Sequence, residues 1–272
     1  MSQIAETFQR LKAANRAAFI PFLAAGDPDI ATTAELIKAA AASGADIIEI
    51  GVPFSDPIAD GPVIQAAFYR ALEKGFRVSQ LFEMVKNLRA GGLKTPLVCM
   101  VSYTLVYKRS LVEFLKSAKA AGFDGLIIPD LPAGYEGDSA ERAAEAGLDL
   151  IFLIAPTTMP ERRELIAKRS RGFIYYISVT GITGARTTLP EDLADNVKDI
   201  QKRTSTPVCV GFGISRPEQA AAVSAVADGV IIGSALVKKI EAAVAEKQQG
   251  QALIQTVAGF IRELAAATGR KS

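Results

Sequence analysis

The sequence has no histidine and only two cysteines among its 272 residues. Without histidine, the chain cannot build a Ser-His-Asp triad, a histidine acid–base pair or a histidine-ligated metal site. Cys99 and Cys209 lie far apart in sequence, without a CxxC spacing, and both fall in segments that we predict to be strands. Such isolated cysteines are typical of small core residues in a reducing compartment, which predicts a cytoplasmic protein.

Long apolar runs and a marked charge imbalance are also missing. No apolar run reaches the ~20 residues that a membrane-spanning helix needs. Residues 1–16 lack the apolar stretch of a secretory signal, and they have the pattern of an amphipathic helix with Ile4, Phe8 and Leu11 on one face. The net charge is +2, which gives no argument for nucleic acid or an anionic membrane as a partner. We therefore expect a soluble chain that binds neither.

Apolar runs alternate with helical patterns along the whole chain, and 49% of the residues are hydrophobic. The runs predict eight strands, rich in Val, Ile and Leu as doubly buried parallel strands should be, at residues 19–24, 46–52, 96–101, 125–129, 149–154, 173–178, 207–210 and 229–232. Helices are predicted between and after them, at residues 30–43, 63–73, 78–90, 110–121, 139–146, 160–169, 191–204, 217–225, 235–246 and 252–267.

Eight strand–helix units in about 250 residues are the pattern of a (β/α)8 TIM barrel. The prediction is an α/β fold with an extra N-terminal helix and extra helices after strands 2 and 8. A doubly wound open sheet is the alternative, but it more often has five or six strands and a GxGxxG turn after the first. No such turn follows residues 19–24, and no Ser/Gly-rich linker interrupts the chain. We therefore predict a single TIM-barrel domain over residues 1–272.

The stretch at residues 47–62, IIEIGVPFSDPIADGP, combines a strand with a stiff loop. Glu49 sits inside an apolar, β-branched run, where a charge is costly unless it is paired or protonated. The prolines and glycines that follow exclude helix and central strand, so the loop carries Asp56 and Asp60 back over the strand end. A site with Glu49 and Asp60 together is the functional interpretation. The alternative is an exposed glutamate on an edge strand and two turn-forming aspartates.

Glycines follow the last three predicted strands, where active sites of such barrels lie. The segments are 181–184, 211–213 and 233–234. Glycine lets backbone N–H groups approach an anion, and helix N-termini favour negative charge, so these loops predict a phosphate site. Ser234 precedes the predicted helix at 235–246, and its hydroxyl is expected to cap that helix, to bind phosphate, or to do both.

The residue types that are absent from the predicted strands and from the chain exclude further classes of enzyme. A Schiff-base aldolase needs a lysine inside a strand, and none of the predicted strands contains one. A metal-dependent aldolase would use histidines, which are absent, and we predict no metal site. Acid–base chemistry by carboxylates on a small phosphate ester remains, with Tyr175 as a further candidate.

Four motifs together resemble the tryptophan synthase alpha chain family: EIGVPFSDPIADGPVIQ at 49–65, SVTGITGAR at 178–186, GFGIS at 211–215 and GSALV at 233–237. The resemblance runs over nearly the whole chain, in the family's order and spacing. It implies a lyase of tryptophan biosynthesis that splits indole-3-glycerol phosphate into indole and glyceraldehyde 3-phosphate. It also implies that this chain has no cofactor and passes indole to a beta chain that contains PLP, in an alpha2-beta2 tetramer.

The resemblance assigns roles to individual residues. The acid–base glutamate falls on Glu49, and the aspartate that binds the indole N–H falls on Asp60. The other positions are phosphate contacts at Gly184, Gly213, Gly233 and Ser234, aromatic pocket positions at Phe22, Tyr175 and Phe212, and Thr183 in a loop that is similar to the family's lid. Asp56 and Pro57 stand at the tip of the loop before Asp60, where we expect the partner to make contact. The exit of the third strand, SYTLVY, departs from the family's usual sequence.

Two rivals stay open at this point. The synthase that makes indole-glycerol phosphate belongs to the same group of barrels, but its chemistry is expected to need a lysine on a barrel strand. The other rival is a non-catalytic subunit that only activates a partner. The presence of Glu49, Asp60 and the glycine loops in one chain argues against it.

Overall fold

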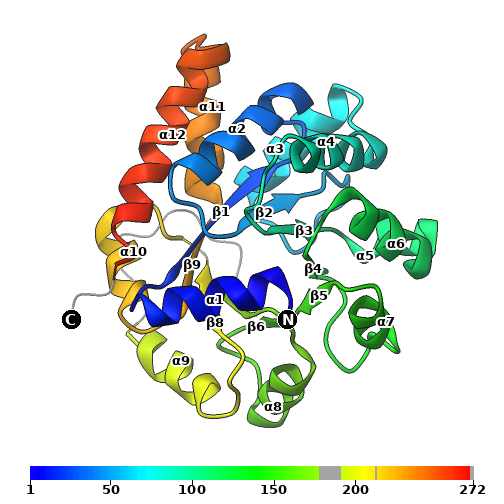
Figure 1. Cartoon of the computed structure of the whole chain (residues 1–272), viewed down its shortest axis with the longest axis vertical. Helices are drawn as coiled ribbons and strands as arrows, with labels where there is room; N and C mark the ends of the chain where they lie inside the picture. Colours follow the sequence, from blue (N-terminus) through cyan, green and yellow to red (C-terminus); the bar gives the residue numbers. More distant parts are fainter. Residues whose placement is uncertain (178–190, 212, 270–272) are drawn as a thin grey trace.

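The computed structural model describes residues 1–177, 191–211 and 213–269, and these form a ring of parallel strands surrounded by helices (Figure 1). The sheet has the strand order β5-β4-β3-β2-β1-β9-β8-β7-β6. The strands are β1 (Ala18–Ala24), β2 (Ile48–Gly51), β3 (Leu97–Met100), β4 (Gly125–Ile127), β5 (Asp149–Ile151), β6 (Leu153–Ile154), β7 (Ile174–Ile177), β8 (Val208–Gly211) and β9 (Gly229–Ile232).

The described helices lie around this ring, apart from α1, which crosses one end of it (Figure 1). They are α1 (Gln3–Ala13), α2 (Ile30–Ala42), α3 (Pro62–Glu73), α4 (Val78–Ala90), α5 (Tyr103–Arg109), α6 (Leu111–Ala121), α7 (Ser139–Glu145), α8 (Pro160–Arg169), α9 (Leu193–Gln201), α10 (Pro217–Ser224), α11 (Ser234–Ala245) and α12 (Gly250–Ala266). The extra helices predicted at the N-terminus and after the second and last strands are present as α1, the pair α3 and α4, and the pair α11 and α12. None of the helices in the described ranges is long and apolar enough to span a bilayer.

The ring closes through β5 and β6, which the sequence predicted as one strand at residues 149–154. The first half of this extended segment pairs with β4 and the second half with β7. Between them, the carbonyl oxygen of Phe152 accepts a hydrogen bond of 3.0 Å from the backbone N–H of Tyr175. The predicted strand thus pairs with β4 over its first half and with β7 over its second half, which closes the ring. The predicted (β/α)8 barrel is confirmed.

Helix α5 was not predicted. Its N-terminus is capped by the side chain of Ser102, which accepts a hydrogen bond from the backbone N–H of Thr104. Asp130, far along the chain, accepts a second one from the N–H of Tyr103. A helix of 7 residues is too short to show a helical repeat of apolar positions, and part of its capping comes from a distant loop, so the local sequence could not indicate it.

Helix α1 lies across the barrel (Figure 1), and its apolar face packs into one end of it. Ile4, Phe8 and Leu11 are buried, as the predicted amphipathic pattern requires. They join the side chains that fill the barrel interior, among them Val98 and Cys209. Because α1 covers this end, ligand access is confined to the other end, where the strands have their carboxyl termini.

Three aspartates fix the starts of the strands. Each stands just before one strand and accepts a hydrogen bond from a backbone N–H at the start of the neighbouring strand. The pairs are Asp46 with Phe19 (3.0 Å), Asp124 with Leu97 (2.9 Å) and Asp228 with Val208 (2.9 Å). Burial raises the pKa of Asp46 and Asp124 above the ordinary range, while these backbone hydrogen bonds oppose the rise. The contacts hold neighbouring strands in register, so the strand ends that carry the site are aligned.

Candidate active site

Glu49 lies in β2, in register with Phe22 of β1 on one side and Val98 of β3 on the other. It is 1% exposed, and its Oε2 atom has no hydrogen-bond partner among the described residues. The alternative of an exposed glutamate on an edge strand is therefore wrong. A buried carboxyl oxygen without a partner is unfavourable for folding, which marks this position as a candidate for chemistry.

Both carboxyls of the site hold protons more tightly than usual. Burial, and secondarily the charge of Asp60, raises the pKa of Glu49 from 4.5 to about 8. Burial, and secondarily the charge of Asp130, raises the pKa of Asp60 from 3.8 to about 7. Near neutral pH, Glu49 is therefore mostly protonated, while Asp60 exchanges its proton in the same range.

The loop between β2 and α3 brings Asp60 to Glu49. The Asp60 N–H donates to the carbonyl oxygen of Pro57 at 3.2 Å. The side-chain amide of Gln65 donates to the carbonyl oxygens of Asp60 at 2.8 Å and of Pro57 at 3.4 Å. Pro62 begins α3 directly after the loop. The loop is thus tied to the helix that follows it, and its path carries Asp60 over the strand end.

One cavity of about 100 Å³ at the carboxyl ends of the strands unites the predicted positions. The predicted site residues that line it are Phe22, Glu49, Asp60, Tyr175, Gly213, Gly233 and Ser234. Thr183, Gly184 and Phe212 lie outside the described residues. The sequence analysis missed apolar lining at Met100, Ile127, Leu153 and Ile177. These residues lie at or near the ends of predicted strands, and only their orientation toward the interior distinguishes them.

Two glycines at strand ends make room for the aromatic rings of the cavity. A Cβ atom on Gly51 would overlap the ring of Phe22, and one on Gly211 would lie 2.6 Å from the Tyr175 ring. Burial, and then the charges of Glu49 and Asp60, raises the pKa of the Tyr175 hydroxyl well above its ordinary value. Tyr175 therefore stays protonated, and it contributes an apolar wall and a neutral hydroxyl.

Gly213, Gly233 and Ser234 line the cavity from the exits of β8 and β9. Gly213 has φ +80°, a conformation that glycine favours. Ser234 is the first residue of α11, and no side chain caps this N-terminus, so Ser234 does not have the predicted capping role. No lysine or arginine is among the described residues that line the cavity. An anion there would be held by backbone N–H groups and the helix dipole.

The described residues contain no cluster that could bind a metal ion.

A smaller cavity of about 30 Å³ adjoins the first and shares Asp60 with it. Asp56 and Pro57 line it together with Ser102 and Asp130. The sequence analysis assigned no role to Asp130. Its proximity to Asp60 depends on how the β2 and β4 exits meet in space, which no local signal reveals.

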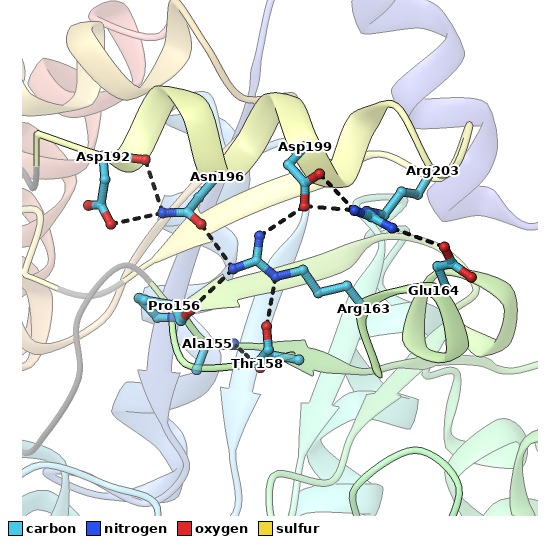
Figure 2. A network of polar contacts seen from close by, with 9 residues as sticks. All are labelled: Ala155, Pro156, Thr158, Arg163, Glu164, Asp192, Asn196, Asp199 and Arg203. Carbon is cyan, nitrogen blue, oxygen red and sulfur yellow. Dashed lines mark hydrogen bonds and ion pairs between the residues drawn. The ribbon is translucent and has the colours of Figure 1, made fainter. Parts of the chain in front are cut away.

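Arg163 connects the segment after β6 to α9 (Figure 2). Its guanidinium donates to the carbonyl oxygens of Thr158 at 2.9 Å and Pro156 at 3.2 Å, in the segment after β6. It also donates to the side chains of Asn196 at 2.9 Å and Asp199 at 3.0 Å, both on α9. The exit of β6 is therefore tied to α9 through one buried arginine.

Comparison with known proteins gives one consistent result. A family model described as "Tryptophan synthase alpha chain" matches residues 8–268. The chain is similar to the tryptophan synthase alpha chain of Rhodopirellula baltica, with 45% identity over 261 residues that cover 95% of this chain and 94% of the relative. The crystal structure of tryptophan synthase subunit alpha from Legionella pneumophila has a TM-score of 0.90 at 34% identity and covers 98% of both chains. A Mycobacterium tuberculosis tryptophan synthase structure has a TM-score of 0.89 at 35% identity and covers 99% of both chains.

The raised pKa of Glu49 makes a prediction about stability. The unfolded chain ionises this carboxyl above its ordinary pKa of 4.5, whereas the folded chain keeps it protonated up to about pH 8. Its contribution to the free energy of unfolding is therefore fully present below about pH 4.5 and is lost as pH rises, by roughly 1.4 kcal/mol per pH unit, up to about pH 8.

The variant Glu49→Gln lacks this loss. In urea unfolding, we expect it to be more stable than the wild type by about 3 kcal/mol near pH 7, with the difference shrinking toward about pH 4.5. Glu73→Gln, at an exposed position of α3, is the control and should follow the wild type at each pH. A Glu49→Gln curve parallel to the wild-type curve would show that Glu49 has an ordinary pKa.

Proposed function

This chain belongs to the tryptophan synthase alpha chain family, and we propose that Glu49 and Asp60 carry out that family's reaction in it. The reaction is the cleavage of indole-3-glycerol phosphate to indole and glyceraldehyde 3-phosphate, a lyase step of tryptophan biosynthesis. The observation that supports these roles best is the buried carboxyl of Glu49, whose Oε2 atom has no partner among the described residues and which lines the same cavity as Asp60.

The substrate sets two requirements for protons. Breaking the bond to indole C3 requires a proton delivered to that carbon. The hydroxyl on the adjoining side-chain carbon must lose its proton, because that carbon becomes the aldehyde. One group that first gives a proton and then takes one satisfies both requirements.

Glu49 fits this double role because it is mostly protonated near neutral pH. As an acid it donates its proton to indole C3, and the bonding electrons of the ring shift so that the nitrogen gains positive charge. As the resulting carboxylate it removes the hydroxyl proton while the carbon–carbon bond breaks. The electron pair of that bond returns to the ring, the charge on nitrogen is lost, and Glu49 is again protonated.

Asp60 fits the role of stabilising the intermediate charge. Its carboxylate lines the cavity and accepts a hydrogen bond from the ring N–H, which strengthens as the nitrogen becomes positive. The apolar lining, with Phe22 and Leu153, suits the flat indole ring.

The glycerol phosphate fits the part of the cavity that the exits of β8 and β9 line. Gly213, Gly233 and Ser234 supply backbone groups at the exit of β8 and at the N-terminus of α11. Binding the phosphate there fixes the distance between the reacting carbon and Glu49. Thr183, Gly184 and Phe212 keep the roles that the family resemblance assigns to them, as proposals.

Neither rival is supported. The described strands contain no lysine, which the synthase of indole-glycerol phosphate is expected to need. A subunit that only activates its partner has no need to bury an unpaired carboxyl, which destabilises the fold.

We also propose the setting in which this chain works. It acts in the cytoplasm as one domain over residues 1–272, has no cofactor of its own, and joins a PLP-containing beta chain in an alpha2-beta2 tetramer. The partner contacts the loop at Asp56 and Pro57. Exposed apolar side chains in the segments after β2, β3 and β4 support this location. They are Ile58 (80% exposed) on the loop after β2, Tyr107 (75%) on α5 and Tyr135 (77%) on the loop after β4.

The first experiment mixes indole-3-glycerol phosphate with the purified chain and measures the release of indole. Glu49→Gln and Asp60→Asn should each lower turnover by about 10²-fold or more, since positioned acid–base groups contribute 10²–10⁴-fold. Thermal unfolding of both variants should show an intact fold, and Glu73→Gln should keep wild-type turnover. Full turnover in Asp60→Asn would reduce Asp60 to a turn former, and turnover above about a hundredth in Glu49→Gln would assign the proton transfer to another group.

A second experiment tests the phosphate side at Gly233, where an added Cβ has room, since its nearest neighbour, Phe22, is 3.7 Å away. Gly233→Val should therefore fold, while its branches crowd the phosphate. We expect glyceraldehyde 3-phosphate to bind about tenfold more weakly, a steric cost of about 1.4 kcal/mol. Indole, which has no phosphate, should bind as to the wild type. Unchanged affinity for the phosphate product would place the phosphate elsewhere.

A third experiment tests the partner surface. A stoichiometric beta chain from the same source should raise indole release, because closing loops assemble such sites. Asp56→Ala should remove the rise, and Ile58→Asp should weaken binding of the beta chain about tenfold or more. Val244→Asp is the control, because Val244 is also exposed but lies on α11. Equal losses in Ile58→Asp and Val244→Asp, or a rise that survives in Asp56→Ala, would contradict the proposed contact.

A further inference from the structure

Asp130 is held in a fixed orientation beside the loop between β2 and α3, which carries Asp60. Its Oδ2 atom accepts a hydrogen bond from the Ser102 hydroxyl at 2.7 Å, and its Oδ1 atom accepts one from the Tyr103 N–H at 2.7 Å. Ser102 is the N-cap residue of α5 and Tyr103 is its first residue, so both carboxylate oxygens are bound to the N-terminus of one short helix. A carboxylate held by two donors on the same element cannot rotate freely.

Asp130 and Asp60 line the same cavity of about 30 Å³. No lysine or arginine is among the described residues that line it, so no cation separates the two carboxyls there. The titratable groups that face Asp60 are Glu49 from β2, Asp56 from its own loop, Asp130 from the β4 exit and Tyr175 from β7. Of these groups, the one whose charge raises the pKa of Asp60 is Asp130.

We propose that Asp130 is a positioning residue for the cleavage: held by α5, its carboxylate acts on Asp60 across the cavity that the two side chains share. The proposal rests on the proposed role of Asp60. Asp130 does not line the larger cavity, in which we place the indole ring and the phosphate.

The effect of Asp130 would suit the reaction. A carboxylate that holds protons more tightly is a stronger hydrogen-bond acceptor, and Asp60 has to bind a ring N–H that becomes more acidic as charge develops on it. The same like-charge effect then passes inward, since the charge of Asp60 raises the pKa of Glu49. Asp130 is therefore the outermost of three carboxyls, each of which affects the next one inward.

Two variants separate the charge of Asp130 from its hydrogen bonds. Asp130→Asn removes the charge but keeps an acceptor for α5. Ser102→Ala removes one hydrogen bond but keeps the charge. In each variant, the titration of the Asp60 carboxyl is followed by NMR with carboxyl-labelled aspartate, and its resonance is identified by its loss in Asp60→Asn. The pH profile of indole release is measured in parallel.

We expect the Asp60 titration to move to lower pH by about half a unit to one unit in Asp130→Asn and to stay at its wild-type midpoint in Ser102→Ala. The acidic limb of kcat/KM should move by the same amount in Asp130→Asn alone. An unmoved Asp60 titration in Asp130→Asn, or equal shifts in both variants, would overturn the proposal. A shifted titration with an unchanged activity profile would support the coupling between the two carboxyls and overturn the catalytic role of Asp60, so the two failures can be told apart.

Discussion

A single buried carboxyl, Glu49, is the constraint on which the site depends. It lies in the middle of the parallel sheet, between Phe22 and Val98, and one of its oxygens has no partner in the part of the chain that the structure describes. Placing it there destabilises the folded chain at neutral pH, and the protonated form is the chemical result. The apolar interior that makes the position unfavourable for folding is the same environment that gives Glu49 a proton to donate. Stability and reactivity at this position therefore have one physical origin.

The rest of the barrel keeps that carboxyl in place and leaves one end open. Helix α1 covers the far end, and aspartates before the strands, such as Asp46 and Asp124, fix their register. Glycines at strand ends, Gly51 and Gly211, admit the rings that surround the reacting groups. The strand ends form a rigid edge, and the loops that follow them come from different parts of the chain. Residues that are distant in sequence therefore line one cavity.

The strands and most helices could be predicted because their signals are local. Runs of β-branched residues and the helical repeat of α1 depend on neighbours within a few positions, and the strands and the helix that they predict are confirmed. The break at Phe152 and the helix α5 depend on contacts with distant residues. β5 and β6 form because one extended segment meets two different strands, and α5 begins where Asp130 accepts from Tyr103. No window of sequence contains either partner.

For the site, the sequence by itself determined which chemistry was available. The absence of histidine, the lone Glu49 in an apolar strand and the glycines after three strands left carboxylate acid–base chemistry on a phosphate ester, and the motifs indicated the family. Only the tertiary structure decided that one oxygen of Glu49 is buried without a partner among the described residues, that Ser234 begins α11 rather than capping it, and that Asp130 stands beside Asp60. The reason is that residue type is a property of the chain, whereas a proton affinity depends on burial and nearby charge, which exist only after distant segments have packed together.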